Sequence, residues 1–322
     1  MPRGAVLIAG AGATGSVVGG LLARAGWPVT LLARRAHLDV IRRRGLRIEG
    51  LFGTHEVRGF TCVADARDAV GPFDAIFLTV KAYDTATMVS AVARLLAPEG
   101  VLLCLQNGLG NIEKASAAVG SGRVLGGRVI FGSELPEPGR VRVTVYADPV
   151  LLGAPDPTDA SLAAAADGWA TALNEAGVPS QPTARIIADL WAKVLYNAAL
   201  NPLGALLGVP YGHLAEDPDT RAIMDTVIEE TFAVAEAEEV ALPWRDAAEY
   251  RNVFYGRLVP STAEHRSSML QDVERGRPTE IDAINGHVAA RGAARGVPAP
   301  VNATLTRLIR ARARRGNERS EA

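Results

Sequence analysis

The residues with the clearest capacity for chemistry lie in one apolar stretch, residues 190–208, which reads LWAKVLYNAALNPLGALLG. Lys193, Asn197 and Asn201 follow one another at intervals of four, so on an α-helix they form a single line, here called the polar stripe. Most neighbouring positions are apolar, and polar groups in such a helix need hydrogen-bond partners. Those partners are either internal groups or the oxygens of a bound substrate. Pro202, directly after the stripe, is expected to kink the helix.

Lysine is rare in this chain. Of its 34 lysine and arginine residues only three are lysine, namely Lys81, Lys114 and Lys193. Burial lowers the pKa of a lysine toward working pH, so a buried lysine can release a proton, whereas arginine stays protonated in proteins. Lys193 is therefore a candidate general acid, and its replacement by arginine would keep the charge but remove the transferable proton.

A glycine-rich motif near the N-terminus points to a dinucleotide. Residues 10–15 read GAGATG, which fits G-x-G-x-x-G, and the motif follows an expected strand (5–10) and opens an expected helix (about 14–25). Such a loop lets a pyrophosphate approach the backbone, and the N-terminus of the helix then faces the phosphates. The alternative is a tight turn without a ligand. The candidate cofactor-binding residues of the loop are Gly10, Ala11, Gly12, Ala13, Thr14 and Gly15.

The second expected strand (28–34) indicates which dinucleotide binds. It ends in Leu31-Leu32-Ala33-Arg34-Arg35, without the acidic residue that usually holds the ribose 2′-hydroxyl of NAD. Arginine suits a 2′-phosphate instead. The sequence therefore predicts NADPH, with Arg34 as the main contact. Arg35 is either a second contact or the solvated start of a helix.

Two further polar residues stand at the ends of expected strands. Lys81 follows the strand at 74–80, and Asn107 follows the strand at 101–106. Ligands of open α/β sheets bind beyond the carboxyl ends of the strands, so both residues are candidate site residues. The alternatives are a surface charge at Lys81 and a plain turn at Asn107-Gly108. Lys114 has no such context and is expected in solvent.

Another polar segment, HRSSMLQDVERGRPTEIDAINGH, spans residues 265–287. Its candidates for chemistry are Ser268, Asp272 and Glu280. A glutamate in the first turn of a helix is also favoured by the helix dipole, so Glu280 has an equally good structural explanation.

The elements that carry these residues change along the chain. The first half alternates short apolar strands with helices, which indicates a parallel sheet covered on both faces. The runs at 141–147 and 149–153 look like antiparallel additions. After residue 183 helical patterns dominate, at 185–207, 219–240, 245–258, 261–275 and 279–295. We predict an α/β Rossmann-type doubly wound N-terminal domain (1–184) that binds NADP, and an all-α C-terminal domain (185–322) that carries the catalytic and substrate-binding residues.

Composition excludes several classes of protein. The net charge of −1 over 322 residues gives no reason to expect nucleic acid or an anionic membrane as a partner, and no apolar run reaches the ~18 residues of a membrane span. The arginine-rich C-terminal stretch suits the end of a helix. Two cysteines, Cys62 and Cys104, read as reduced thiols of a cytoplasmic protein. The five histidines lack metal-ligand spacing, so no metal is expected, and the sequence is compatible with a homodimer.

The motifs together resemble the ketopantoate reductases, or 2-dehydropantoate 2-reductases. The resemblance spans nearly the whole chain and rests on GAGATG, VKAYDT, LQNG, WAKVLYNAALNPL and SSMLQDVERGRPTEID, of which the last two are the most specific. It implies a Rossmann domain, a helical domain and an active site in the cleft between them. It also implies NADPH-dependent reduction of a small 2-keto acid, ketopantoate, to pantoate on the route to pantothenate and coenzyme A.

The resemblance assigns roles to individual residues. Lys193 matches the catalytic lysine, which protonates the keto oxygen as hydride reaches the keto carbon. The matches to substrate-binding residues are Asn197, Asn201 and Ser268. Lys81 and Asn107 match residues near nicotinamide and substrate, and Glu280 matches an acidic residue near the cofactor and active site.

One residue departs from the family pattern. Where the family often reads Pro-Asn-Gly, this chain reads Pro210-Tyr211-Gly212, and the replaced asparagine belongs to the family's substrate-binding set. Residues 126–150 also differ from the usual version. Two alternatives therefore stay open: an NAD(P)-dependent D-2-hydroxy acid dehydrogenase acting on a bulkier 2-keto acid, and a non-catalytic NADPH sensor. The complete set of Lys, Asn, Ser and Glu candidates argues against the sensor.

Overall fold

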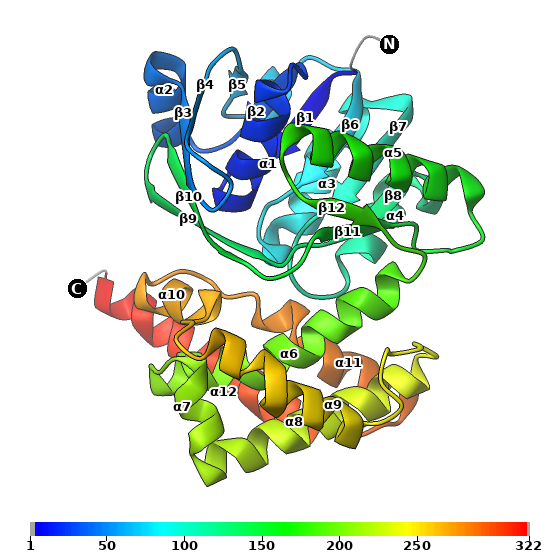
Figure 1. Ribbon diagram of the computed structural model, residues 1–322, viewed down its shortest axis with the longest axis vertical. Coiled ribbons are helices and arrows are strands. Elements are labelled where there is room, and N and C mark those ends of the chain that lie inside the picture. The colour runs from blue at the N-terminus through cyan, green and yellow to red at the C-terminus, as the bar shows by residue number, and fades with distance from the viewer. Residues whose placement is uncertain (1–3, 321–322) are drawn as a thin grey trace. The chain divides into compact units, whose positions relative to one another are not determined.

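A computed structural model describes the backbone of residues 4–320 and the side chains of residues 4–314 (Figure 1). The chain forms two compact units. The first comprises the residues up to Asn107 together with Asn111–Ile186, and the second comprises Gly108–Gly110 together with the chain from Ile187 onward.

An eight-stranded sheet forms the centre of the first unit. Its strands lie in the order β12-β11-β8-β7-β6-β1-β2-β5, and all neighbours are parallel except β8 and β11. From β8 to β5 this is the Rossmann order, in which the chain leaves β1 in one direction and resumes at β6 on the other side. The strands span β1 Val6–Ala9, β2 Val29–Leu32, β5 Thr61–Val63, β6 Phe73–Leu78, β7 Leu96–Cys104, β8 Val124–Arg128, β11 Val150–Gly153 and β12 Ser180–Pro182.

Helices cover both faces of this sheet (Figure 1). Helices α1 and α5 pack together, as do α3 and α4. One face buries alternate strand residues such as Ile8, Leu31 and Phe77 against α1 and α5. Because helices cover the other face as well, the strands are apolar throughout. The helices of this unit are α1 Ala13–Arg24, α2 Arg35–Arg44, α3 Thr85–Val92, α4 Asn111–Val119 and α5 Ala160–Ala176. The predicted doubly wound fold is confirmed.

A second, four-stranded sheet with the order β4-β3-β10-β9 was not foreseen from the sequence. Strand β10 pairs with β3 in parallel and with β9 antiparallel, so the run at 141–147 lies outside the main sheet. β11, in contrast, joins the main sheet antiparallel to β8, as the sequence suggested. The strands of the second sheet span β3 Leu46–Gly50, β4 His55–Val57, β9 Phe131–Glu137 and β10 Arg140–Tyr146.

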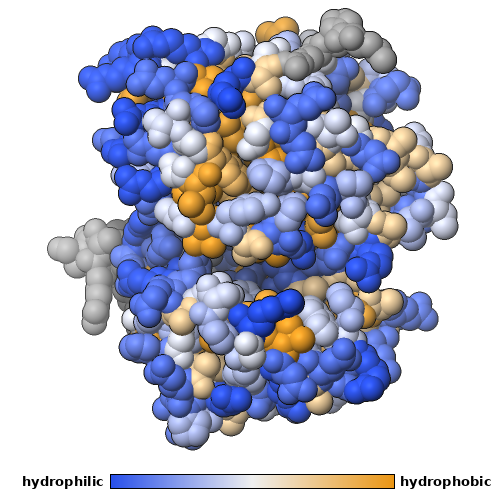
Figure 2. Space-filling model, in the orientation of Figure 1, coloured by the Kyte–Doolittle hydropathy of each residue, from blue (hydrophilic) through white to orange (hydrophobic). Residues whose placement is uncertain are grey.

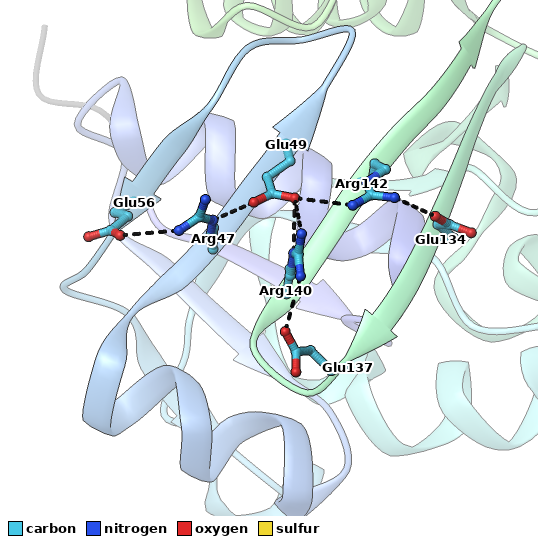
Figure 3. Close-up of polar contacts among 7 residues, drawn as sticks. All are labelled: Arg47, Glu49, Glu56, Glu134, Glu137, Arg140 and Arg142. Carbon is cyan, nitrogen blue, oxygen red and sulfur yellow. Dashed lines mark hydrogen bonds and ion pairs between the residues drawn. The ribbon is translucent and has the colours of Figure 1, made fainter.

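An ion cluster crosses the second sheet at Glu49 (Figure 3). Only 12% of the Glu49 side chain is exposed, and it accepts hydrogen bonds from Arg47 (2.5 Å) and Arg140 (2.7 Å). Arg142 lies 3.6 Å away. These hydrogen bonds, first that from Arg140, lower the pKa of Glu49. Arg47 and Arg140 face each other across the paired strands, so the carboxylate of Glu49 offsets the repulsion between them.

The second unit is helical, as predicted. Its helices are α6 Ile186–Leu207, α7 Tyr211–Glu216, α8 Pro218–Ala237, α9 Ala247–Val253, α10 Ser268–Glu274, α11 Asn285–Arg295 and α12 Pro300–Ser320. Three expected helices are shorter than their sequence patterns. A π-helical turn, Phe254–Leu258, follows α9, and only the last part of 261–275 is α-helical. The pattern at 279–295 becomes α-helical only at Asn285, after a short 3₁₀ turn. The arginine-rich stretch lies in α12, although its side chains from residue 315 onward lie outside the described part.

The surface is mixed in character. Figure 2 shows hydrophilic residues over most of the visible face, with smaller hydrophobic groups among them. Within the described chain, no helix is both long enough and apolar enough to cross a membrane.

Candidate functional site

The glycine loop connects β1 to α1 and is braced by the end of β6. Gly10 has φ of +105°, and a Cβ placed on it would lie 2.5 Å from Val80 Cγ1. A Cβ on Gly15 would lie 2.5 Å from Thr79 Oγ1. The same Thr79 hydroxyl donates to the carbonyl of Gly10 at 2.9 Å. Two of the three motif glycines are therefore required by packing against the residues that directly follow β6.

The remaining motif glycine, Gly12, has a different environment. It is exposed, and a Cβ placed on it would meet only the carbonyl oxygen of Gly10, at 3.9 Å. Helix α1 begins here without a side-chain cap and without an acidic residue in its first turn. Backbone N–H groups at such an end attract anions, so this loop fits the pyrophosphate of a dinucleotide.

A buried histidine connects the loop to the second sheet. The backbone N–H of Gly139 donates to Nδ1 of His37 (3.0 Å), so the ring proton is on Nε2, which donates to the Ser16 hydroxyl (3.1 Å). Ser16 in turn donates to the carbonyl of Ala11 (3.3 Å). Burial lowers the pKa of His37. Sequence reasoning missed His37, which lies only two residues beyond the Arg34-Arg35 pair.

Arg34 is exposed where the chain leaves β2, at the position preceding the first residue of α2. Among the residues described, neither Arg34 nor Arg35 is engaged by another side chain. A shallow cavity of about 280 Å³ opens at the ends of β2 and β5, lined mainly by apolar side chains, including Leu32, Ala64 and Met88. Asp65 and Asp84 also line this cavity, whereas Arg34 does not; Leu32 of the lining precedes Arg34 by two residues. An exposed arginine at this strand end suits the 2′-phosphate of NADP.

Lys81 and Asn107 follow β6 and β7 as expected, each half-buried. A buried chain of side chains supports the second of these strand ends. Gln106 donates to the Thr85 hydroxyl (3.0 Å), Thr85 donates to Asn111 (2.8 Å), and Asn111 donates to the carbonyl of Asn107 (3.0 Å). This network fixes the backbone at Asn107. Lys114 is exposed.

The polar stripe lies on α6 in the second unit, where Lys193 is half-buried and the two asparagines are buried. Asn201 is contacted at two points. The hydroxyl of Tyr211 donates to its side-chain oxygen (2.5 Å), and the hydroxyl of Ser267 donates to its backbone carbonyl (3.4 Å). The stripe thus has internal partners at its C-terminal end.

Helix α6 continues through Pro202. Proline lacks the N–H that would bond the carbonyl four residues earlier, here that of Ala198. The side-chain amide of Asn285 supplies the missing donor at 3.0 Å. Asn285 also donates to Asn302 (3.0 Å), and Asn302 donates to the buried carboxylate of Glu230 (2.8 Å). This network supports α6 between Asn197 and Asn201.

The segment that follows α9 holds the remaining candidates. Ser268 is the exposed first residue of α10, whereas Asp272 and Glu280 are buried. The N-cap is Ser267, whose hydroxyl accepts from the N–H of Leu270 (3.0 Å). Sequence reasoning singled out Ser268 and missed Ser267, although a serine directly before a helix is a known capping signal.

The turn after Asn107 belongs to the second unit. The N–H of Leu109 donates to the carbonyl of Ala283 (2.8 Å), and a Cβ on Gly108 would lie 2.4 Å from the same oxygen. Ala283 closes the short turn that begins after Glu280. The second unit therefore brings the turn of the LQNG motif next to the segment of Glu280. Among the described residues, no group of three acidic, histidine or cysteine side chains is arranged to hold a metal ion.

Comparison with known protein families identifies the chain. Residues 6–157 match the model of the ketopantoate reductase PanE/ApbA family, and residues 185–313 match the model of that family's C-terminal domain. The chain belongs to the ketopantoate reductase family. As a family member it is an enzyme of the 2-dehydropantoate 2-reductase type. Enzymes of this type are oxidoreductases that act on a 2-keto acid with NAD(P) as the cofactor.

Ketopantoate reductase relatives match almost the entire chain. A 2-dehydropantoate 2-reductase of Aquifex aeolicus is 40% identical over 310 residues, covering 95% of this chain and 96% of the relative. The corresponding enzyme of Archaeoglobus fulgidus is 36% identical over 305 residues, covering 95% and 96%.

Solved structures of a ketopantoate reductase and of a D-mandelate dehydrogenase are both similar to this chain. A PanE/ApbA family ketopantoate reductase of Ralstonia eutropha superposes with a TM-score of 0.86 at 34% identity, covering 97% of this chain and 99% of the other. A D-mandelate dehydrogenase in a ternary structure with NADH and anilino(oxo)acetate superposes with a TM-score of 0.87 at 28% identity, with the same coverage.

Proposed function

We propose that the protein reduces 2-dehydropantoate to pantoate with NADPH, on the route to pantothenate and coenzyme A. The observation that carries the proposal is the polar stripe of α6: one of three lysines in the chain lies in line with two buried asparagines. Close relatives named as 2-dehydropantoate 2-reductases support the choice of substrate.

The first unit offers a fit for the cofactor. Its uncapped helix N-terminus and the open face at Gly12 suit a pyrophosphate. The exposed Arg34, without an acidic residue at this strand end, suits the 2′-phosphate that distinguishes NADPH from NADH. When bound, NADPH supplies the hydride that reduces the keto carbon.

Lys193 is proposed to donate a proton to the keto oxygen as negative charge develops there. General acid catalysis of this kind contributes about 10²–10⁴-fold. Asn197, Asn201 and Ser268 are proposed to hold the substrate by hydrogen bonds to its carboxylate and hydroxyl groups. Neutral amides bind an acid without placing a second charge beside the lysine.

The remaining candidates are proposed to act on the cofactor side. Lys81 and Asn107 would contact the nicotinamide end and the substrate, and Glu280 would contact the cofactor and assist catalysis. We accordingly assign NADP binding to residues 1–184 and catalysis to residues 185–322. Free cysteines at Cys62 and Cys104 are in keeping with a cytoplasmic location.

A panel assay tests the proposed function. NADPH oxidation is followed at 340 nm with 2-dehydropantoate, with branched aliphatic 2-keto acids and with an aromatic one. We expect the highest kcat/KM with 2-dehydropantoate. Absence of turnover with every acid would refute the assignment and favour a non-catalytic NADPH-binding protein.

A second candidate function is an NAD(P)-dependent D-2-hydroxy acid dehydrogenase for a bulkier acid. The superposition on a D-mandelate dehydrogenase and the presence of Tyr211 favour it. The same panel decides between the two, since this candidate requires phenylglyoxylate to exceed 2-dehydropantoate in kcat/KM.

A further inference from the structure

Tyr211 stands where the family often has an asparagine, and its surroundings are those of a core residue. It is the first residue of α7, and only 3% of it is exposed. Its ring packs edge-on against Tyr196, with 5.8 Å between ring centroids, and lies 5.2 Å from the ring of His265. Its backbone N–H donates to the carbonyl of His265 (3.2 Å). The ring is therefore held in one position by packing on two sides.

The Tyr211 hydroxyl has one acceptor among the described residues, Oδ1 of Asn201 at 2.5 Å. A buried phenol needs an acceptor for its proton, because an unsatisfied hydroxyl costs free energy. An amide could rotate to present its nitrogen to the phenol, but the phenol proton would then be left without an acceptor. The contact therefore fixes the orientation of the Asn201 amide, with the oxygen toward Tyr211.

This orientation makes the side-chain amide of Asn201 a hydrogen-bond donor toward a ligand. Its oxygen accepts the Tyr211 proton through one lone pair, and Nδ2 donates to no group in the described part of the chain. The side of the amide turned away from Tyr211 therefore carries the donor nitrogen. The backbone of Asn201 is also held, through the Ser267 hydroxyl at 3.4 Å. A group fixed in this way suits an acceptor-only partner such as a carboxylate or a keto oxygen.

We infer that Tyr211 is a positioning residue that fixes Asn201 as a hydrogen-bond donor to the acceptor oxygens of the 2-keto acid. The inference rests on the proposed function and deepens it. An asparagine at position 211 could bind a substrate through its own amide. The hydroxyl of Tyr211 instead donates its proton to Asn201. Position 211 thus no longer contacts the substrate directly, and Tyr211 instead orients Asn201, which does.

A double-mutant cycle tests this inference. Tyr211→Phe removes the hydroxyl and keeps the ring, and Asn201→Ala removes the amide. We expect Tyr211→Phe alone to raise KM for 2-dehydropantoate about 5- to 30-fold, as for about 1–2 kcal/mol of lost binding, with KM for NADPH unchanged. In the Asn201→Ala background, the same change should alter KM less than about twofold, because the group it positions is absent.

Tyr255→Phe is the matched control. Tyr255 lies in the same unit, and its hydroxyl bonds Asp225 at 2.7 Å and the carbonyl of Arg221 at 3.4 Å, so this variant also loses the hydrogen bonding of a tyrosine hydroxyl. We expect its KM for 2-dehydropantoate to equal that of the wild type. If Tyr211→Phe raised KM equally in both backgrounds, or if Tyr255→Phe reproduced its effect, the positioning role would be wrong.

The test separates this inference from the proposed function. Wild-type turnover of 2-dehydropantoate tests the function, and the cycle tests Tyr211. If the wild type shows no turnover, the same cycle is measured by calorimetric titration of 2-dehydropantoate into the NADP⁺-bound proteins. The inference is overturned if the losses of binding free energy in the two single variants are additive, or if 2-dehydropantoate does not bind. Asn201→Ser replaces Asn201→Ala if circular dichroism shows the alanine variant to be unfolded.

Discussion

The side-chain amide of Asn285 donates a 3.0 Å hydrogen bond to the main-chain carbonyl of Ala198, the carbonyl that Pro202 leaves without its helical partner. A proline within a buried helix normally costs stability because this carbonyl loses its donor. Here a residue from α11 supplies the donor, at the turn of α6 that carries Asn197 and Asn201. The geometry of the polar stripe therefore depends on a residue 84 positions away from Asn201 along the chain (285 minus 201).

Removing this donor should destabilise the protein. We predict that Asn285→Ala lowers the free energy of unfolding by about 1–3 kcal/mol, the cost of a buried acceptor without a partner. Urea denaturation measures it. Pro202→Ala restores an N–H for Ala198, so the double variant should lose less than the sum of the two single variants. If the changes in unfolding free energy of the two single variants simply added up in the double variant, Asn285 would not act through the carbonyl of Ala198.

Lys193→Arg tests the general acid. We predict that kcat falls about 10²–10⁴-fold while folding and NADPH binding persist, since arginine keeps the charge but holds its proton. Stopped-flow or steady-state kinetics give kcat, and fluorescence titration gives NADPH affinity. Lys114→Arg makes the same exchange at an exposed position and should leave kcat unchanged. Near wild-type turnover by Lys193→Arg would disprove the role.

Arg34→Ala tests cofactor choice. We expect KM for NADPH to rise about 10- to 100-fold, as for the loss of about 1.5–3 kcal/mol from a charge-assisted hydrogen bond. KM for NADH should hardly change, because NADH lacks the 2′-phosphate. Arg43→Ala, which changes an exposed arginine in the last turn of α2, is the control. Wild-type preference for NADH would contradict the prediction at the outset.

Two of the motif glycines, Gly12 and Gly15, should respond differently to alanine. Gly12→Ala adds a methyl group to open space, so we predict normal thermal stability with KM for NADPH raised about tenfold or more, a loss of about 1.4 kcal/mol in binding. Gly15→Ala meets Thr79 and should lower stability by about 1–3 kcal/mol. Thermal denaturation and cofactor titration of both variants measure the contrast. Equal destabilisation by both would show that the space at Gly12 is filled.

His37 should make stability depend on pH. Burial lowers its pKa below the ordinary value of 6.5, and that of His265 likewise. The folded state therefore favours the neutral rings, whereas the unfolded chain protonates them below about pH 6.5. The contribution of the two histidines to the free energy of unfolding is thus fully present above pH 6.5 and is lost as the pH falls toward their lowered pKa values. We predict a smaller loss in His37→Gln than in the wild type between pH 7.5 and 5.5, measured by urea denaturation. An unchanged pH dependence would exclude His37 as a contributor.

Local patterns in the sequence were sufficient for the main sheet and for most helices. The glycine motif and the four-residue spacing of the polar stripe each depend on neighbouring residues, so both can be read from one stretch of chain. The second sheet could not be predicted, because β3 pairs with β10, about ninety residues away, and no local pattern encodes that choice. The network of Asn285 was also hidden, since the donor and the carbonyl it satisfies come from different helices. Tyr211 was recognised as unusual, but its contact with Asn201 required the fold.

The assignment of Gly108–Gly110 to the second unit has a practical consequence for dissecting the protein. The chain passes from one unit to the other after Asn107, returns after Gly110 and crosses again after Ile186. No single cut separates the two units. A fragment ending near residue 184 would retain the turn of the LQNG motif but lose the Ala283 carbonyl that holds Leu109. Expression of the N-terminal half alone would therefore deprive that turn of its support, and complementation by two separately produced halves would have to restore the hydrogen bond from Leu109 to Ala283.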